Sequence, residues 1–258
     1  MGAILAVAVS VGLALVAWRA GALTRDGALA AALVGGAVLF GTGWSGAAML
    51  AAFFIPSTAV GRFALARGVA SDPAAERRTA AQVLANGGAA ALGAFLEPSL
   101  SGLGIWIVCG ALAAASADTW ATSIGAFSGK QPRHLLTRRP VPRGTSGGVS
   151  PMGTLAALAG AAIVAVSGGV AGGGVPLFVA GVAIGFGGML LDSLLGATLQ
   201  GRFECPRCGV ATERRTHRCG TPARVVGGWR WLDNDGVNAL STTLAALAAA
   251  GAWWACSG

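Results

Sequence analysis

Charged side chains are scarce in this sequence of 258 residues. Only 11% of the residues are Asp, Glu, Lys or Arg, whereas 54% are hydrophobic, and the mean hydropathy is +0.68. Soluble domains have about 25% charged residues, so this composition excludes an ordinary soluble fold. The 42 glycines are typical of transmembrane helices that pack closely through small side chains. We therefore expect an all-α polytopic membrane protein, with residues 1–258 forming one integral membrane domain.

The sequence also lacks three signals of other classes. Its formal charge is +8, but the basic residues form no single patch interleaved with aromatic side chains, which argues against nucleic-acid binding. The first apolar run has no basic residue before it and therefore resembles an uncleaved span rather than a signal peptide. No G-x-x-x-x-G-K-[ST] sequence is present, which excludes a phosphate-binding loop of that type.

Eight apolar runs approach the length of about 17 to 25 residues that is needed to cross the hydrocarbon core. The division near Gly43 is the weakest, because residues 27–61 are almost continuously apolar, and six or seven spans are the alternatives. The predicted spans are approximately residues 3–18, 27–43, 44–61, 80–96, 103–123, 151–170, 175–199 and 236–257.

Basic residues occur only in alternate loops between these runs. The first, third, fifth and seventh loops contain 2, 4, 5 and 7 of the 18 Lys and Arg residues, and the other three loops contain none. Because basic loops are retained in the cytoplasm, this pattern favours eight spans in the cell membrane with both termini outside.

Two aspartates follow long apolar runs. Asp118 and Asp192 are each followed by a hydroxyl residue, and the next basic residue comes 12 and 10 positions later, respectively. Both predicted spans run from outside to inside, so we expect the two carboxylates at similar depth near the cytoplasmic end. A charge in the membrane is costly and commonly marks a functional site. The alternative is an ion pair with an arginine that holds helices together.

A third acidic group precedes the last span on the same side. Asp233 and Asp235 flank Asn234, and any one of these three residues could cap the following helix. Mg²⁺ binds carboxylate oxygens and completes its coordination with water and substrate phosphates. Convergence of the acidic groups on one face therefore predicts Mg²⁺ held by Asp118, Asp192 and Asp235.

The fifth loop is basic and rich in glycine. Glycine lets backbone N–H groups approach an anion closely, and hydroxyl and guanidinium groups add donors for phosphate oxygens. The alternative is a flexible basic linker. The residues predicted to bind nucleotide phosphates are Lys130, Arg143, Gly144, Thr145, Ser146, Gly147, Gly148 and Ser150.

Acidic metal ligands beside a basic, glycine-rich loop at a membrane surface indicate phosphoryl or nucleotidyl transfer to a lipid. Such chemistry depends on positioning and electrostatic stabilisation, with the metal bridging the phosphates. The lipid would enter laterally between helices and meet a water-soluble nucleotide at the cytoplasmic face.

Five short motifs occur in order: QVLANGG at 82–88, SADTWATSIG at 116–125, PRGTSGGVSPMG at 142–153, LLDSLLGATLQ at 190–200 and WLDNDGVN at 231–238. Together they resemble the transmembrane-protein-19-like family, whose plant members are phytyl-phosphate kinases, and more distantly the phytol and dolichol kinases. The resemblance implies conversion of an isoprenoid monophosphate to its diphosphate by a nucleoside triphosphate, CTP or ATP. A homo-oligomer is a further expectation.

The resemblance also implies which polar groups form the catalytic crevice. Asn86 is one of them, although it could instead pack helices through a hydrogen bond. The family pattern has an acidic residue a few positions after its Asp-Thr pair, where this chain has Thr122 and Ser123. The catalytic residues implied by the resemblance are Asn86, Asp118, Asp192, Asn234, Asp235 and Asn238.

The seventh loop, residues 202–231, contains the sequence CPRCGVATERRTHRCG. Its C-x2-C and H-x-C pairs, Cys205, Cys208, His217 and Cys219, offer four ligands that suit tetrahedral Zn²⁺. Cytoplasmic thiols stay reduced, so no disulfide is expected. We expect a structural zinc in a small knuckle-like loop. Reduced cysteines without metal, and a redox or catalytic role, are the alternatives.

Two other functional classes remain open. A transporter would use intramembrane carboxylates as ion or proton sites, and it would place them near the bilayer midplane. A scaffold would use the zinc loop to recruit a partner, but this leaves Asp118 and Asp192 unexplained.

Overall fold

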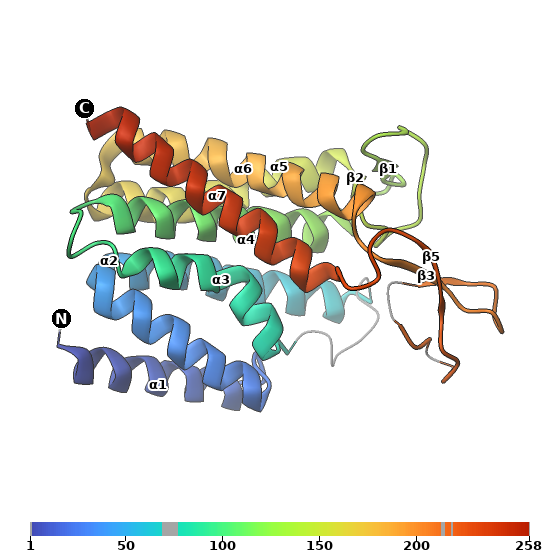
Figure 1. Cartoon of the computed structure of the whole chain (residues 1–258), viewed down its shortest axis with the longest axis horizontal. Helices are drawn as coiled ribbons and strands as arrows, with labels where there is room; N and C mark the ends of the chain where they lie inside the picture. Colours follow the sequence, from blue (N-terminus) through green and yellow to red (C-terminus); the bar gives the residue numbers. More distant parts are fainter. Residues whose placement is uncertain (1, 69–76, 213–214, 218, 258) are drawn as a thin grey trace.

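The structure is a computed structural model that describes residues 2–68, 77–212, 215–217 and 219–257. The chain forms a bundle of long helices with small β elements at one end (Figure 1). The helices are α1 (Ala3–Arg19), α2 (Arg25–Ala66), α3 (Ala80–Ala94), α4 (Leu103–Gly125), α5 (Pro151–Gly168), α6 (Gly174–Thr198) and α7 (Asn234–Ser257), with the π-helical turn η2 (Gly169–Gly173) before α6.

Helix α4 lies at the centre of the bundle. It contacts α2, α3, α5, α6 and α7, and nearly all of its residues from Leu103 to Ala117 are buried. A helix that is apolar on all sides is stable where other helices surround it. The central position of α4 brings its polar end, which begins at Asp118, close to several neighbouring helices.

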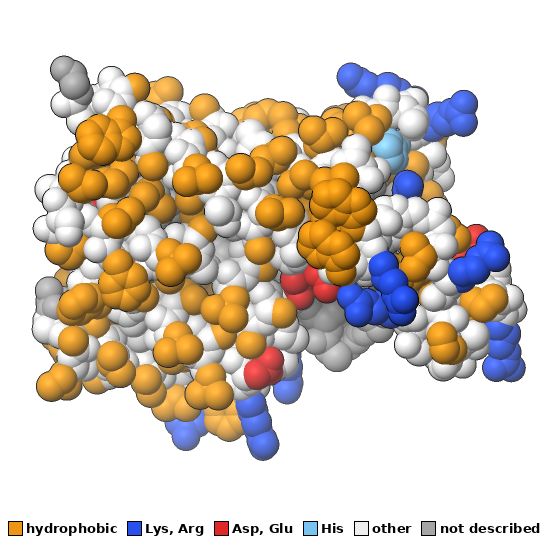
Figure 2. Space-filling view, viewed as in Figure 1, with side chains coloured by type: hydrophobic (Ala, Val, Ile, Leu, Met, Phe, Trp, Pro, Cys, Tyr) orange, Lys and Arg blue, Asp and Glu red, His pale blue; other side chains and the backbone are white. Residues whose placement is uncertain are grey.

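The outer faces of the bundle are apolar. Ile4, Leu29, Leu33 and Val175 are each more than 70% exposed. Figure 2 shows hydrophobic side chains over the left and middle of the molecule, whereas Lys and Arg lie at its right and along its lower edge. Such an apolar surface suits lipid and not water.

Four helical stretches are long and apolar enough to cross a membrane: Arg25–Ala66, Leu103–Gly125, Pro151–Thr198 and Asn234–Ser257. The prediction of a helical membrane protein is thus confirmed. The count of eight spans is not supported, because α1 has 17 residues, at the lower limit of about 17 for crossing a bilayer, and α3 has only 15. The predicted spans 27–43 and 44–61 fall in one stretch, as do 151–170 and 175–199.

The stretch Arg25–Ala66 reverses direction in its middle. Gly43 has φ 63° and ψ −148°, which is outside the helical region. Arg62, in the second half, donates a hydrogen bond to the carbonyl oxygen of Ala20, which precedes the first half. The two halves are therefore antiparallel, as the chain path in Figure 1 shows.

Two groups of short strands lie together at the right end of the bundle in Figure 1. Strands β1 (Arg133–His134) and β2 (Gly148–Val149) pair antiparallel. Strands β3 (Arg202–Glu204), β4 (Ala211–Thr212) and β5 (Arg224–Gly227) form an antiparallel sheet in the order β4-β3-β5. The all-α expectation missed these strands because none exceeds four residues, too short to show alternation of polar and apolar side chains.

Candidate functional site

Close packing of α4 against α6 sets the relative depth of their side chains. A Cβ built at Gly185 would lie 2.8 Å from the Cβ of Ala113, and one built at Gly188 would lie 2.5 Å from that of Ala114. Only glycine allows this approach. The contacts advance in the same direction along both helices, so α4 and α6 run parallel.

Asp118 and Asp192 follow this contact at the same distance. Each lies four residues, about one helical turn, beyond the Ala114–Gly188 contact. The packing therefore brings the two carboxylates to one level, near enough for their charges to interact. This is the arrangement expected from the sequence.

Asp192 is 9% exposed and is held by α7. The hydroxyl of Ser241 donates to its Oδ2 atom at 2.9 Å. Among the described residues, no arginine is paired with either Asp118 or Asp192. An Asp–Arg pair between helices, the structural alternative, is thus not present in this part of the chain.

The glycine-rich loop is a defined turn packed on α6. Gly147 has φ 77°, and a Cβ built there would lie 2.5 Å from the Cβ of Ala197. The Gly148 amide donates to the Thr145 carbonyl at 2.9 Å. Arg143 donates to the Ala126 carbonyl at 2.7 Å and also to that of Ser128. These contacts connect the loop to the ends of α4 and α6.

The loop meets the two aspartates in a cavity of about 170 Å³, here called the aspartate cavity. Ser150 caps α5 at its edge, its Oγ accepting from the Gly153 amide at 3.1 Å. The predicted residues that line the cavity are Asp118, Asp192, Asn234, Arg143, Gly144, Thr145, Ser146, Gly147, Gly148 and Ser150.

Thr154 also lines the cavity, and no prediction included it. Its position had a sequence signal, because Ser150 followed by Pro151 is typical of a helix start. Thr154 is one turn beyond that start and therefore faces the same side as the capping residue.

Four predicted residues lie elsewhere. Asn86 donates to the Gln82 carbonyl of its own helix at 2.8 Å, and Asn238 is buried within α7. Lys130 lines a neighbouring cleft. Asp235 is half-buried in the first turn of α7 but does not line the aspartate cavity, because consecutive helical residues differ by about 100° in direction.

Asp233 has a structural role at the same helix start. Its Oδ1 accepts from the Gly236 amide at 3.0 Å, which is the contact of an N-terminal cap. The capping alternative thus applies to Asp233, while Asn234 contributes to the cavity.

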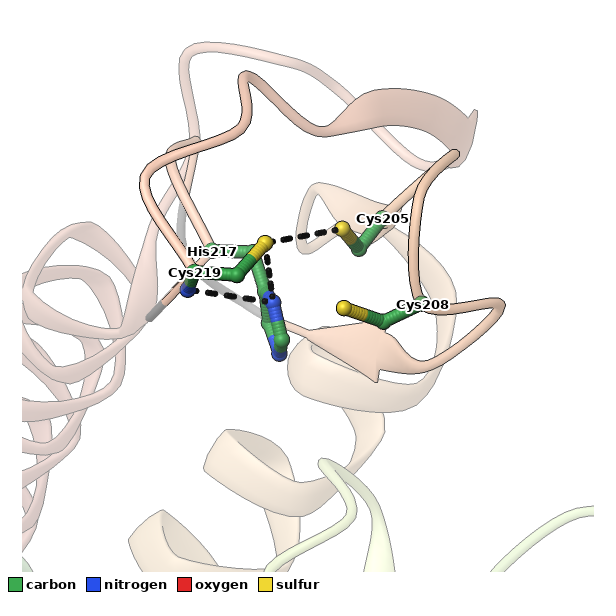
Figure 3. A group of neighbouring side chains, drawn as sticks. All are labelled: Cys205, Cys208, His217 and Cys219. Atoms are coloured by element: carbon green, nitrogen blue, oxygen red, sulfur yellow. Dashed lines mark hydrogen bonds between the residues drawn. The ribbon is translucent and has the colours of Figure 1, made fainter.

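Cys205, Cys208, His217 and Cys219 form a second cluster, in the loop between α6 and α7 (Figure 3). One ligand atom from each of the four lies within 4.8 Å of the others. The Sγ atoms of Cys205 and Cys219 are 3.6 Å apart, and Nδ1 of His217 is 3.1 Å from Sγ of Cys219. The cluster can hold one metal ion.

In each half of this cluster, the second ligand is followed by a glycine in the left-handed conformation. Gly209 follows Cys208 with φ 65°, and Gly220 follows Cys219 with φ 82°. Each of these glycine amides donates to the carbonyl of the first ligand in its half, Cys205 or His217, at 2.8 and 2.9 Å. Glycine adopts this left-handed backbone without steric cost, so both ligand pairs are presented inward.

The thiols of the cluster differ in acidity. Thr221 and His217 lower the pKa of the Cys219 thiol to about 6, whereas hydrogen bonds with Cys219 and Cys205 raise the pKa of Cys208 to about 11. The thiols thus compete for protons that a bound metal displaces. Three thiolates and an imidazole are a donor set compatible with zinc.

Residues 8–246 match the family described as Integral membrane protein DUF92. The chain belongs to this family. An uncharacterized membrane protein of Methanocaldococcus jannaschii is 31% identical over 84% of this chain and 87% of its own length. Protein PGR of Arabidopsis thaliana is 30% identical over 93% of this chain and 92% of its own.

An uncharacterized membrane protein of Synechocystis is 30% identical over 81% of this chain and 74% of its own length. No solved structure matches the chain. The DUF92 match includes the aspartate cavity and the Cys/His cluster. Both therefore belong to the part of the chain that the family describes.

Proposed function

We propose that this DUF92 protein is a membrane-embedded isoprenoid lipid kinase. It transfers a phosphoryl group from CTP or ATP to a prenyl or phytyl monophosphate and produces the diphosphate. The observation that carries this proposal is the aspartate cavity, in which two carboxylates without an arginine partner among the described residues face a glycine-rich loop.

The donor set of the cavity fits Mg²⁺. Asp118 and Asp192 provide oxygen ligands at one level of the bundle, and neither has an arginine partner among the described residues. Bound Mg²⁺ would neutralise charge on the transferred phosphates. Asp235 is left out of this ligand set, because it does not line the cavity.

The protein's own groups then position the substrates. The guanidinium of Arg143 and the backbone amides near Gly147 and Gly148 orient phosphate oxygens. The N-terminus of α5, capped by Ser150, adds the favourable end of a helix dipole for an anion.

The resemblance to phytyl-phosphate kinases supports an isoprenoid monophosphate as the acceptor. The position of the cavity agrees with it, because a lipid head group and a water-soluble nucleotide can meet only where the membrane ends. Most Lys and Arg side chains in Figure 2 lie toward the end of the bundle that holds the cavity.

The proposed topology has eight spans in the plasma membrane, with the cavity facing the cytoplasm and both termini outside. The reversals at Gly43 and at Gly172, with φ 117°, support six of these spans, because each divides a long apolar stretch in two. The shorter helices α1 and α3 would be the remaining two. Cysteines introduced at Arg139 and Arg215 should be labelled from the cytoplasm, and one introduced at Gly172 from outside. Opposite labelling of the first two loops would contradict the model of eight spans.

The direct test uses purified protein in detergent with Mg²⁺, labelled CTP or ATP, and a panel of prenyl alcohols and monophosphates. We expect labelled prenyl diphosphate, and none from the Asp118→Asn variant prepared in parallel, which controls for contaminating kinases. Absence of any phosphorylated lipid, together with cation-dependent flux in liposomes, would favour the transporter.

A further inference from the structure

A second cleft borders the aspartate cavity. It has a volume of about 670 Å³, and its cationic side chains are Lys130, Arg133 and Arg138. We call it the basic cleft. Val149, Ser150 and Thr154 line both spaces, so the two form neighbouring parts of one surface at the start of α5.

The two spaces have opposite charge. The lining of the basic cleft contains three cationic side chains and no carboxylate, whereas that of the aspartate cavity contains two carboxylates and one guanidinium. A ligand complementary to both must carry a cation at one end and a run of negative charge at the other. A metal-bound polyphosphate has this distribution of charge.

The volumes of the two spaces assign the same parts of the ligand to them. Pockets that hold a whole small molecule measure about 300–1,000 Å³. The aspartate cavity, at about 170 Å³, is large enough for a phosphate group with its metal but not for a nucleotide. The basic cleft, at about 670 Å³, is large enough for the remainder of the nucleotide.

Arg133 and Arg138, which line the basic cleft, are linked by a hydrogen bond between the side chain of the first and the backbone of the second. Arg138 is the one non-glycine residue with positive φ among those described, at 59°. Its carbonyl accepts from Nη1 of Arg133 at 2.9 Å, and its amide donates to the His134 carbonyl at 2.9 Å. The hydrogen bond to the Arg138 carbonyl thus holds the Arg133 guanidinium in place, and the turn that follows β1 fixes the backbone from which the Arg138 side chain extends.

We propose that the basic cleft binds the phosphate chain of a nucleoside triphosphate, and that the terminal phosphate reaches into the aspartate cavity. The assignment rests on the proposed kinase function, which requires such a donor. A prenyl monophosphate shares the phosphate chemistry, but its single phosphate group needs fewer than three cations.

Binding of each probe alone to the full-length protein in detergent, with Mg²⁺ and without a chelator, tests this assignment apart from catalysis, because phosphoryl transfer requires both substrates. The probes are CTP, ATP, inorganic triphosphate and farnesyl monophosphate. Arg138→Asn removes the charge, and asparagine tolerates the left-handed backbone. Arg138→Lys keeps the charge. Arg139→Asn is the matched control, because it removes the same charge from the next residue, which does not line the cleft.

We expect Arg138→Asn to raise the Kd of the nucleotides and of inorganic triphosphate by about tenfold or more, the usual effect of losing a charged hydrogen bond. Arg138→Lys should recover most of the affinity, and Arg139→Asn should stay within about twofold because exposed charges are screened. Affinity for farnesyl monophosphate should not change in any of them.

Three outcomes would overturn the assignment: equal losses in Arg138→Asn and Arg139→Asn, a loss confined to farnesyl monophosphate, or no loss. The first would indicate a general basic surface, and the second an acceptor site. Lipid phosphorylation is measured separately on the same samples. If no lipid is phosphorylated but nucleotide affinity depends on Arg138, the kinase proposal fails while the polyphosphate site stands.

Discussion

The Cys/His cluster and the aspartate cavity both gather metal-type ligands, but the chain assembles them differently. The four Cys/His ligands come from one loop, and all lie within 15 consecutive positions. Asp118 and Asp192 are 74 positions apart on two helices, and the loop that faces them comes from between those helices. A local site depends on turns, whereas the cavity depends on how closely α4, α6 and the loop pack.

Neutralising the aspartates should have the largest effect. Asp118→Asn or Asp192→Asn keeps size and hydrogen bonding but removes the charge that binds Mg²⁺, and turnover per folded molecule should fall by about 100-fold or more. The measurement is lipid phosphorylation over a Mg²⁺ titration, with Glu204→Gln, an exposed carboxylate on β3, as the control. Turnover near that of the unmodified protein, with unchanged Mg²⁺ dependence, would remove both aspartates from the mechanism.

Breaking the Cys/His cluster should change the metal content and the thermal stability of the protein more than its catalytic turnover. Elemental analysis of protein prepared without chelators should find about one Zn²⁺ per chain. Cys205→Ser should lose it and lower the melting temperature by about 5 °C or more. Cys256→Ser, at the exposed end of α7, is the matched control. Zinc-free protein of unchanged stability would argue against a structural metal.

Displacing the glycine-rich loop from α6 should disturb the aspartate cavity and leave the rest of the fold intact. Gly147→Ala adds a methyl group that would lie 2.5 Å from the Cβ of Ala197, and we expect turnover to fall by about tenfold to 100-fold. Gly144→Ala creates similar backbone strain at φ 80°, but its Cβ would meet no atom within 4 Å. A smaller loss in Gly144→Ala isolates the packing contribution, and equal losses would attribute the effect to backbone strain.

Removing the hydroxyl that supports Asp192 should have the smallest effect. Ser241→Ala deletes the 2.9 Å hydrogen bond to Oδ2 of Asp192, and the Mg²⁺ concentration for half-maximal turnover should rise by about tenfold. Thr243→Ala, whose hydroxyl bonds only within α7 to the Ala239 carbonyl, should leave it unchanged. The same shift in both variants would indicate a general disturbance of α7.

The sequence was informative about features that depend on residues close together in the chain. A scarcity of charge and long apolar runs imply helices in a membrane, because unpaired backbone groups are too costly in lipid. The short C-x2-C and H-x-C spacings led to the Cys/His cluster, since a single turn brings each pair together. Likewise, Ser150 followed by Pro151 predicts the start of α5.

Apolar length alone could not count the spans. Hydropathy divides residues 27–61 near Gly43, but it does not say whether the chain continues or reverses there. The reversal is established by the backbone of Gly43 and by the contact of Arg62 with Ala20. The roles of Mg²⁺, nucleotide and lipid stay predictions.

What only the tertiary structure decided is which polar residues face one another. The sequence predicts Asp118 and Asp192 at similar depth, but only the Gly188–Ala114 contact shows that α4 and α6 pack directly against each other there. The direction of each side chain around α7 puts Asn234 in the cavity and leaves Asp235 outside, although the two are adjacent in sequence. The sequence by itself determined the chemistry that is available, because side-chain type is fixed by composition. The packing of helices determined where that chemistry converges, because it depends on contacts between residues far apart in the chain.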